Sequence, residues 1–343
     1  MAVYTTIDDP EKYFQTKLYT GSEGTDTISL DSDVMQPDMV WIKDRGTTAA
    51  HTIQDAVRGW NAANKISSNH TSGEDDSEGA TWGNYGYVSA VASSSFTVVE
   101  GANTPSQVND GGGDTYIAWC WKESATAGFD IVGFTGTGSA KTESHSLSAV
   151  PKMIIAKNRV DTSNWSVYHV DNENTHNLRL NDTSAKEDDS SIWNDTTPTS
   201  SVFSVGTDNN VNGSSDNIIA YLWAEKQGFS KFGSYIGNSN ADGTFVHTGF
   251  RPAFIMVKAT NTTENWNIFD NKRSNSFNAI DGRIIPNTTA AEETNVTPCD
   301  FVSNGVKFRY SDGAWNNSSN TYIYMAFAEA PFVNSNGVPC NAR

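Results

Sequence analysis

Apolar residues along this chain come in short runs, separated by segments rich in glycine, asparagine, aspartate and serine. No stretch sustains the period of about 3.6 residues that an amphipathic helix requires. The runs are instead dominated by β-branched and aromatic residues, which are typical of strands. The pattern therefore predicts an all-β chain of many short strands with long polar connections.

One block of this pattern occurs three times. In each copy, a proline is followed by a nearly continuous apolar run that ends on a lysine. These runs are Pro37–Lys43, Pro151–Lys157 and Pro252–Lys258. A run without polar alternation indicates a central strand with both faces covered. Proline is tolerated at the first residue of such a strand, where a missing N–H does not break the ladder.

Each copy also opens on a glycine after an aromatic-led strand and closes on an aromatic-rich strand. The opening glycines are Gly21, Gly136 and Gly237, and the closing strands are Thr115–Glu123, Asn217–Glu225 and Thr321–Glu329. The glycines are 115 and 101 residues apart, which exceeds the period of solenoid repeats. Each copy therefore has the size of a separate domain.

We expect three tandem, homologous, antiparallel β-sandwich domains of a jelly-roll-like type. Their predicted bounds are residues 18–125, 129–226 and 230–332, followed by a C-terminal tail at 333–343. The connections between the domains are short, and this predicts a semi-rigid rod.

Residues 1–17 precede the first copy and have no counterpart before the other two. The composition of residues 2–7 predicts a strand, which ends at the Asp-Asp-Pro sequence that follows. This strand pairs either with the edge of its own domain or with the edge of a neighbouring subunit. In the second case, contact is heterologous and generates a head-to-tail homopolymer. The candidate assembly residues are Val3, Tyr4, Thr5, Thr6 and Ile7.

The chain is acidic, with 40 Asp and Glu against 23 Lys and Arg and a formal net charge of −17. Nucleic acids and anionic membranes attract clustered Lys and Arg, so this charge argues against both as partners. We expect neither a Sec-type signal peptide nor membrane insertion, because no basic-then-apolar N-terminal segment and no apolar run of spanning length occurs. The polar, weakly charged composition is common among all-β virion and extracellular proteins, which predicts such a location.

The sequence offers no catalytic or cofactor motif. Its six histidines are scattered without metal-ligand spacing, and no P-loop or nucleophile elbow occurs. Glu123, Glu225 and Glu329 stand at the same position of the three closing strands. Glycoside hydrolysis uses two carboxylates across one cleft, so three equivalent single carboxylates favour a structural role. We expect no enzymatic activity, no catalytic or metal-binding residue and no cofactor.

Two segments of the first copy have more than one interpretation. The acidic run Glu74–Glu78 offers oxygen ligands for Ca²⁺, but it lacks the spacing of a known calcium loop, which favours a solvated loop. Trp82, Tyr85 and Tyr87 lie among glycines, and they suit either stacking on a glycan or packing within the loop. Packing is the simpler interpretation.

The three cysteines argue against a disulfide framework or a zinc site, because their number is odd and no CxxC spacing occurs. Cys120 lies within a closing strand, which indicates a small buried apolar side chain. Cys299 and Cys340 could pair with each other. Glycosylation sequons, among them Asn181 and Asn287, are about as frequent as the composition gives by chance.

Several segments resemble tail-fibre-like proteins of tailed bacteriophages, especially aquatic ones. They are Gln36–Lys43, His51–Gly59, Tyr116–Lys122, Asn265–Arg273 and Tyr322–Phe332, with the Tyr13–Gln15 lead-in. The resemblance covers nearly the whole chain, but it carries over no catalytic or ligand residue. The coiled-coil or collagen-like shaft of long tail fibres is missing from this sequence.

The resemblance implies a non-enzymatic structural fibre subunit of a virion or an extracellular fibre, with a role in host attachment. Its implied partners are other copies of the chain and a host surface glycan. Three alternatives remain open at this point. They are a homopolymeric filament linked by N-terminal strand donation, a glycan-binding adhesin or receptor-binding protein, and a depolymerase.

Overall fold

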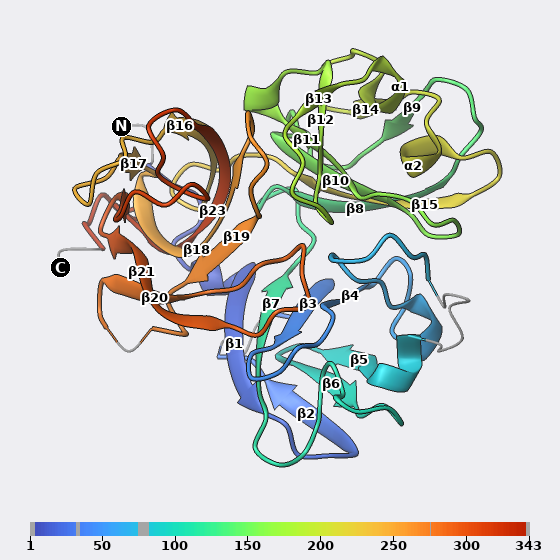
Figure 1. Ribbon diagram of the computed structural model, residues 1–343, viewed down its shortest axis with the longest axis horizontal. Coiled ribbons are helices and arrows are strands. Elements are labelled where there is room, and N and C mark those ends of the chain that lie inside the picture. The colour runs from blue at the N-terminus through green and yellow to red at the C-terminus, as the bar shows by residue number, and fades with distance from the viewer. Residues whose placement is uncertain (1–3, 32–34, 75–81, 275, 341–343) are drawn as a thin grey trace.

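The computed structural model describes residues 4–31, 35–74, 82–274 and 276–340. Nearly all of its regular structure is β-strand, and every strand pair is antiparallel, which confirms the predicted all-β class. The strands form three consecutive groups, which we call units 1, 2 and 3 (Figure 1).

The units comprise residues 10–123, 129–225 and 230–331. Unit 1 contains η1 (Pro10–Lys12), β1 (Phe14–Thr20), β2 (Thr25–Ser29), β3 (Met39–Asp44), β4 (Thr52–Asp55), η2 (Ala62–Asn64), η3 (Trp82–Tyr85), β5 (Tyr87–Ala92), β6 (Ser95–Val99) and β7 (Thr115–Trp121). Unit 2 contains β8 (Phe129–Thr135), β9 (Lys141–Ser144), β10 (Met153–Asn158), β11 (Ser166–His169), η4 (Val170–Asn172), β12 (His176–Arg179), β13 (Glu187–Asp188), α1 (Ser190–Trp193), β14 (Val202–Val205), α2 (Asn209–Asn212) and β15 (Asn217–Trp223). Unit 3 contains β16 (Ser230–Ile236), β17 (Phe245–His247), β18 (Phe250–Ala259), β19 (Asn267–Asp270), β20 (Ala279–Arg283), β21 (Glu293–Val302), β22 (Gly305–Phe308) and β23 (Thr321–Pro331).

Each unit has an inner sheet with the same strand order. The first strand pairs with the closing strand, which pairs with the proline-led strand and then with the strand that follows it. The orders are β1-β7-β3-β4, β8-β15-β10-β11 and β16-β23-β18-β19, and in unit 2 the strands β12 and β13 extend the sheet. The register also agrees, since the lysines of the proline-led strands all lie opposite an isoleucine of the closing strand. Common ancestry of the three units stays a prediction.

A smaller outer sheet accompanies each inner sheet. The outer orders are β2-β6-β5, β14-β9 and β17-β22-β21-β20. Each unit has its own buried cluster between its two sheets, with Phe96 in unit 1, Phe203 in unit 2 and Phe308 in unit 3. Alternate residues of the outer strands face this cluster, as the period of two in a strand requires. Each unit is thus a small β-sandwich.

The second face of all three inner sheets packs into one shared core. Trp121, Trp223 and Phe327 occupy the same register position of the three closing strands and belong to a single buried cluster. The ring centroid of Trp121 lies 6.2 Å from that of Trp223 and 5.8 Å from that of Phe327. Figure 1 shows the units as three lobes around this centre. The predicted semi-rigid rod is therefore wrong. A sheet that is apolar on both faces has to be covered on both, and here the outer sheet covers one face while the neighbouring units cover the other.

The described part of the N-terminal segment, from residue 4 on, lies against unit 3 and does not form a strand before β1. Ile7 N–H donates to Thr5 Oγ1 at 3.0 Å, a local turn that replaces strand pairing. Thr5 and Ile7 are buried, and Tyr4 Oη donates to Gly249 O at 2.6 Å. The predicted strand over residues 2–7 is thus wrong for residues 4–7, and Val3 lies outside the described residues.

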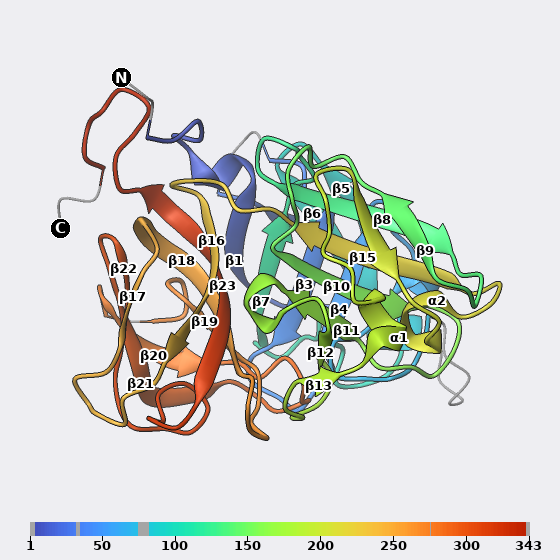
Figure 2. The same cartoon turned by 90° about the horizontal axis from the view of Figure 1, so that it is seen from above.

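The described parts of the N-terminal segment and of the C-terminal tail lie side by side next to unit 3 (Figure 2). Ser335 N–H, in the C-terminal tail, donates to the carboxylate of Asp8 at 2.6 Å. The first strand, β1, starts at Phe14, so the predicted boundary of the first domain at residue 18 divides a strand. The N-terminal extension is therefore shorter than expected.

Candidate functional site

The three units meet in three seams, which we call seam 1–2, seam 2–3 and seam 3–1, and together they close a ring. The residue just before β4, β11 or β19, the strand that follows the proline-led strand, donates a hydrogen bond across each seam. Trp165 Nε1 donates to Ser67 O of unit 1 at 2.9 Å, and Trp266 Nε1 donates to Arg179 O of unit 2 at 2.8 Å. Each indole also packs on apolar neighbours in the shared core. The two seams are therefore built on the same contact.

Seam 3–1 has a histidine in the place of the tryptophan. His51 Nε2 lies 3.2 Å from Ile285 O of unit 3, and His51 Nδ1 accepts from Trp41 Nε1 at 2.9 Å. Because Nδ1 is an acceptor, the proton of the neutral ring is on Nε2, which donates to the carbonyl. Burial, helped by the nearby Lys43, lowers the pKa of His51 well below its usual range. This histidine is thus a neutral structural donor.

The lysines that end the proline-led strands are buried at the seams. Lys157 Nζ donates to Thr71 O of unit 1 at 2.9 Å, and Lys258 Nζ lies 3.3 Å from Thr183 O of unit 2. Lys43 Nζ donates to the carbonyl oxygen of the next residue at 2.6 Å. Burial lowers the pKa of Lys43 and Lys258 to about 8. The apolar run that ends on lysine therefore places a charge where backbone carbonyls surround it.

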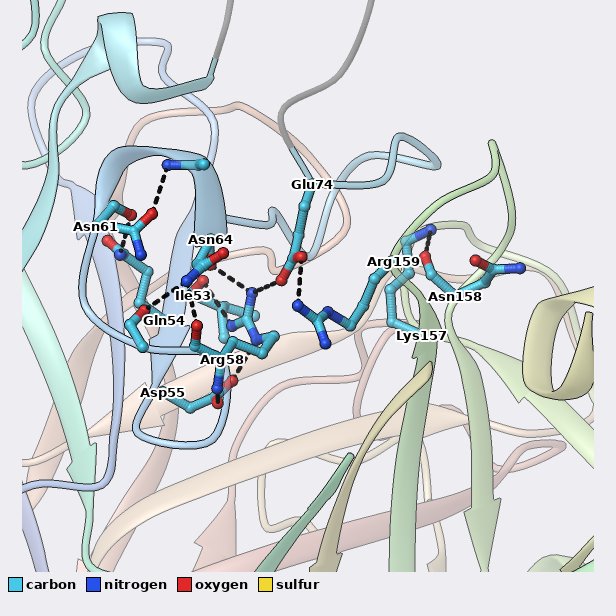
Figure 3. A network of polar contacts seen from close by, with 12 residues as sticks. Ile53, Gln54, Asp55, Arg58, Asn61, Asn64, Glu74, Lys157, Asn158 and Arg159 are labelled. Atoms are coloured by element: carbon cyan, nitrogen blue, oxygen red, sulfur yellow. Dashed lines mark hydrogen bonds and ion pairs between the residues drawn. The ribbon is translucent and has the colours of Figure 1, made fainter. Parts of the chain in front are cut away.

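A buried ionic network crosses seam 1–2 (Figure 3). Arg58 Nε lies 2.5 Å from the carboxylate of Asp55, and Arg58 Nη1 lies 2.9 Å from Glu74. Glu74 also pairs with Arg159 of unit 2 at 2.7 Å. Tyr221 Oη, from the closing strand of unit 2, donates to Asp55 at 2.7 Å. The side chains of Arg58 and Asp55 are fully buried, so each depends on the other for its charge balance.

Seam 3–1 repeats this network with other residues. Arg273 Nε lies 2.7 Å from Asp270, and Arg273 Nη1 lies 3.1 Å from Glu292. Glu292 pairs with Arg45 of unit 1 at 2.5 Å. The indole of Trp119, from the closing strand of unit 1, points its Nε1 at Asp270 over 3.3 Å. Two seams therefore hold an Arg–Glu–Arg triad in corresponding places.

Seam 2–3 has other groups at the same positions. His169 stands where the other units have the buried aspartate, and its Nε2 lies 3.1 Å from Tyr324 O of unit 3. Burial lowers the pKa of His169 to about 4, which keeps the ring neutral at physiological pH. The other two seams have a backbone bond from Glu74 N–H to Arg159 O and from Glu292 N–H to Arg45 O. Seam 2–3 keeps this bond, from Lys186 N–H to Thr260 O at 2.8 Å, but Thr260 offers no charge in the place of the arginine. The ring is thus similar in geometry at all three seams but differs in charge.

The three glutamates at the ends of the predicted closing strands have three different partners. Glu225 pairs with Lys231 at 2.8 Å, and Glu329 pairs with Arg251 at 2.5 Å. Asp130 of unit 2 stands at the strand position that Lys231 has in unit 3. Glu123 therefore faces a carboxyl where Glu225 faces an ammonium group. Burial and the hydrogen bond with this carboxyl raise the pKa of Glu123 to about 7. The three glutamates therefore make structural contacts with other side chains, and only Glu123 faces a second acid.

This difference predicts a pH dependence at seam 1–2. The pKa of Glu123 is higher in the folded chain than its usual value of 4.5, so the protonated form stabilises the fold and that stabilisation is lost as pH rises through about 7. We expect the wild type to lose about 1 kcal/mol between pH 5 and 8 relative to Glu123→Gln, less than full linkage because the carboxyl is only half-buried. Denaturant unfolding at both pH values measures this.

Glu225→Gln is the matched control, because its partner is a lysine. This variant should follow the wild-type pH profile across the same range. Equal profiles for the wild type and Glu123→Gln would contradict the shared proton at Glu123.

Glycan contact at the three candidate residues of the first copy stays a prediction. Tyr85 and Tyr87 are half-buried on consecutive elements, η3 and β5, and the side chain of Trp82 lies outside the described residues. Of the acidic run at 74–78, only Glu74 is described, and it belongs to the seam network. Cys120 and Cys299 are buried free thiols and Cys340 is an exposed one, so the pairing of Cys299 with Cys340 is not formed.

Sequence reasoning missed the buried arginines. Arg58 and Arg273 each stand three residues after the aspartate that ends β4 or β19. An Asp-x-x-Arg spacing at the same place in two of the three copies was the available signal. Asn181 and Asn287, noted only as sequons, accept the backbone N–H of Trp165 and of Trp266. Both are therefore structural residues of the seams.

No group of three or more His, Cys, Asp or Glu side chains among the described residues is placed to hold a metal ion. Within the same part of the chain, no helix is long and apolar enough to cross a membrane. A search of curated proteins gives no match to this chain. One family, described as a domain of unknown function (DUF7483), matches residues 9–331, a span that includes all three units. The chain therefore belongs to the DUF7483 family.

Proposed function

We propose that this protein is a non-enzymatic structural subunit of a virion or extracellular fibre, of the phage tail-fibre type. The observation that carries the proposal is the closed ring of three sandwiches around one aromatic core. Its buried charges are paired within a unit or across a seam, or they contact backbone carbonyls. This arrangement resists displacement of one unit against another, which is the property that a fibre subunit needs.

Other copies of the chain are the proposed partner, and unit 3 is the proposed contact. Residues 229–343 carry nine basic and nine acidic side chains, so the net charge of −17 lies elsewhere in the chain. Six of the nine large apolar residues that are exposed in the described chain belong to unit 3 or its tail. They are Ile236, Phe245, Phe277, Tyr310, Phe332 and Val338. A unit that has no net charge and exposes several apolar side chains, on an otherwise acidic chain, suits contact with another copy.

Electron microscopy with light scattering on the purified chain tests this assembly. We expect multimers that Ile236→Ser with Phe245→Ser reduces to monomers. The matched control is Val57→Ser with Val160→Ser, which changes two exposed apolar residues of units 1 and 2 and should leave assembly intact. A wild-type chain that stays monomeric at high concentration would exclude self-assembly.

Enzymatic activity has its own test. Incubation of the pure protein with host polysaccharide should give no sustained release of reducing ends. Release that Glu123→Gln, Glu225→Gln or Glu329→Gln abolishes would overturn the non-enzymatic part of the proposal and favour a depolymerase.

Strand donation and glycan binding are less well supported than the fibre subunit. Strand donation by the N-terminal segment has to withdraw the buried Thr5 and Ile7 from their own chain. A glycan-binding role is favoured by one feature, an open groove of about 290 Å³ lined by Tyr310, Asp312 and Trp315. Tyr310 is 56% exposed and has a left-handed φ of 61°, which is unusual for a bulky residue. Loss of glycan binding in Tyr310→Ala would support this second candidate.

A further inference from the structure

β17 is an edge strand of the outer sheet of unit 3 with one side unpaired. It pairs with β22, and no described strand lies on its other side. At Thr244 and Thr248, hydrogen bonds of 3.0 Å run to the β22 side. Because alternate residues of an antiparallel strand bond to the same side, the N–H and C=O groups of Phe245 and His247 point away from β22. These groups bond to no other described residue.

The corresponding edge strands of units 1 and 2 carry charges, whereas β17 does not. β2 and β9 are, like β17, the second strand of their unit and an edge of its outer sheet. β2 contains Asp26, and β9 contains Lys141 and Glu143, which pair with each other at 2.6 Å. Charged side chains on an edge strand oppose pairing with another chain. β17 has no acidic residue, lysine or arginine, and its Phe245 is 44% exposed. Of the three corresponding edges, only that of unit 3 is therefore open to pairing.

The surface next to this edge is apolar, and the charge beside it is balanced. Thr244 Oγ1 donates to Ile236 O at 2.7 Å, which holds the end of β16 beside the start of β17. Ile236 is 64% exposed. Lys307, which lies opposite Phe245 in β22, pairs with Asp242 at 2.8 Å. The edge therefore combines unpaired backbone groups with exposed apolar side chains.

The distribution of charge favours a second copy of the chain as the partner of this edge. Residues 1–228 carry the whole net charge of −17, whereas residues 229–343 carry nine acidic and nine basic side chains. Contact through unit 1 or 2 brings two acidic surfaces together, but contact through unit 3 brings two neutral units together. Both views show β17 on the side of unit 3 that faces away from units 1 and 2 (Figures 1 and 2). A pair joined at β17 thus keeps the acidic units of the two copies apart.

We propose that β17 pairs with β17 of a second copy, antiparallel and around a two-fold axis at Val246. In this register Phe245 of each copy lies opposite His247 of the other, so every outward N–H and C=O group of the edge gains a partner. With the axis on Phe245 or on His247 instead, the opposite residue is Gly243 or Gly249, whose N–H groups already donate within their own chain. The contact is isologous and closes on itself, which gives a pair of chains as the repeating unit. This inference rests on the proposed self-assembly and specifies its contact.

Sedimentation velocity of the full chain over a concentration series tests the pairing. His247→Pro removes an N–H that faces the partner and none that bonds to β22, so the fold should tolerate it. We expect this variant to raise the dissociation constant of the pair roughly 10- to 100-fold. Thr142→Pro in β9 is the matched control and should leave the dissociation constant unchanged. The N–H of Thr142 also points away from its paired strand, since His145 N–H donates to Ser201 O on the β14 side.

A second variant and a second readout do not depend on proline. Phe245→Lys gives β17 the kind of charge that β9 has, and it should also weaken the pair. Circular dichroism checks that each variant folds. Hydrogen exchange of the wild type should show slower exchange of the Phe245 and His247 amides at high concentration than at low concentration. Equal exchange of both amides at the two concentrations in an assembled wild type would overturn the edge contact.

Failure of the edge contact can be told apart from failure of the proposed self-assembly. An assembled wild type whose dissociation constant is unchanged by both His247→Pro and Phe245→Lys would overturn the edge contact alone. A wild-type chain that stays monomeric would overturn both proposals.

Discussion

Replacement of Arg58 by Met is expected to lower the free energy of unfolding by about 3–5 kcal/mol. Arg58 and Asp55 are both fully buried, and their carboxylate–guanidinium contact is the main charge compensation for each. Without the arginine, Asp55 keeps only the hydroxyl of Tyr221 as a side-chain partner from the neighbouring unit. An uncompensated carboxylate in the interior is the cause of the large loss. Denaturant unfolding followed by tryptophan fluorescence measures it.

Two controls separate the buried pair from the rest of the network. Arg159→Met removes the partly exposed end of the triad and should cost less than about 1 kcal/mol. The double variant Asp55→Asn with Arg58→Met should cost less than Arg58→Met alone, because the orphaned charge is gone. A loss below 1 kcal/mol for Arg58→Met would contradict the burial and pairing of this residue.

Truncation of Trp121 to Ala should cost a similar amount, about 3–5 kcal/mol, through a cavity at the centre of the shared core. The indole contacts aromatic rings of all three units, including Phe14, Trp223 and Phe327. Loss of this side chain therefore weakens the whole ring at once. We expect a single cooperative transition that shifts as a whole, whereas independent domains would give a separate transition for unit 1.

The matched control is Trp121→Phe. Trp121 Nε1 is buried and has no hydrogen-bond partner among the described residues, and unit 3 has Phe327 at the corresponding position. The substitution therefore removes an unpaired donor and leaves only a small void, so its cost should stay below about 1.5 kcal/mol. Similar losses for the alanine and phenylalanine variants, or a loss below 1 kcal/mol for alanine, would contradict this account of the core.

The shared core determines how the chain responds to bending. Three separate domains on short linkers would bend at residues 124–128 and 226–229. In the ring, the same linkers run beside buried residues, since Ala127 and Phe229 both belong to the shared cluster. Bending at a linker would therefore expose apolar surface of two units. This coupling is why the seams, rather than any single unit, are the candidate functional site.

The hydrophobic pattern by itself determined the class of the fold and its inner strands. The apolar runs that follow Pro37, Pro151 and Pro252 are fully buried strands, as their lack of alternation required. Local sequence suffices there, because the period of polar and apolar residues sets which faces of a strand are covered.

Only the tertiary structure decided what covers those faces. The continuous apolar runs around Trp119 and Tyr221 indicate that both faces of the strand are buried. They do not indicate whether the residues that cover each face come from the same unit or from a neighbouring one. The rod was a wrong prediction for this reason. Composition predicted a strand at residues 2–7, yet Ile7 lies in the shared core, where its apolar side chain is removed from water. The ion pairs that cross the seams could not be predicted either, because Glu74 and Arg159, or Glu292 and Arg45, meet only when the ring closes.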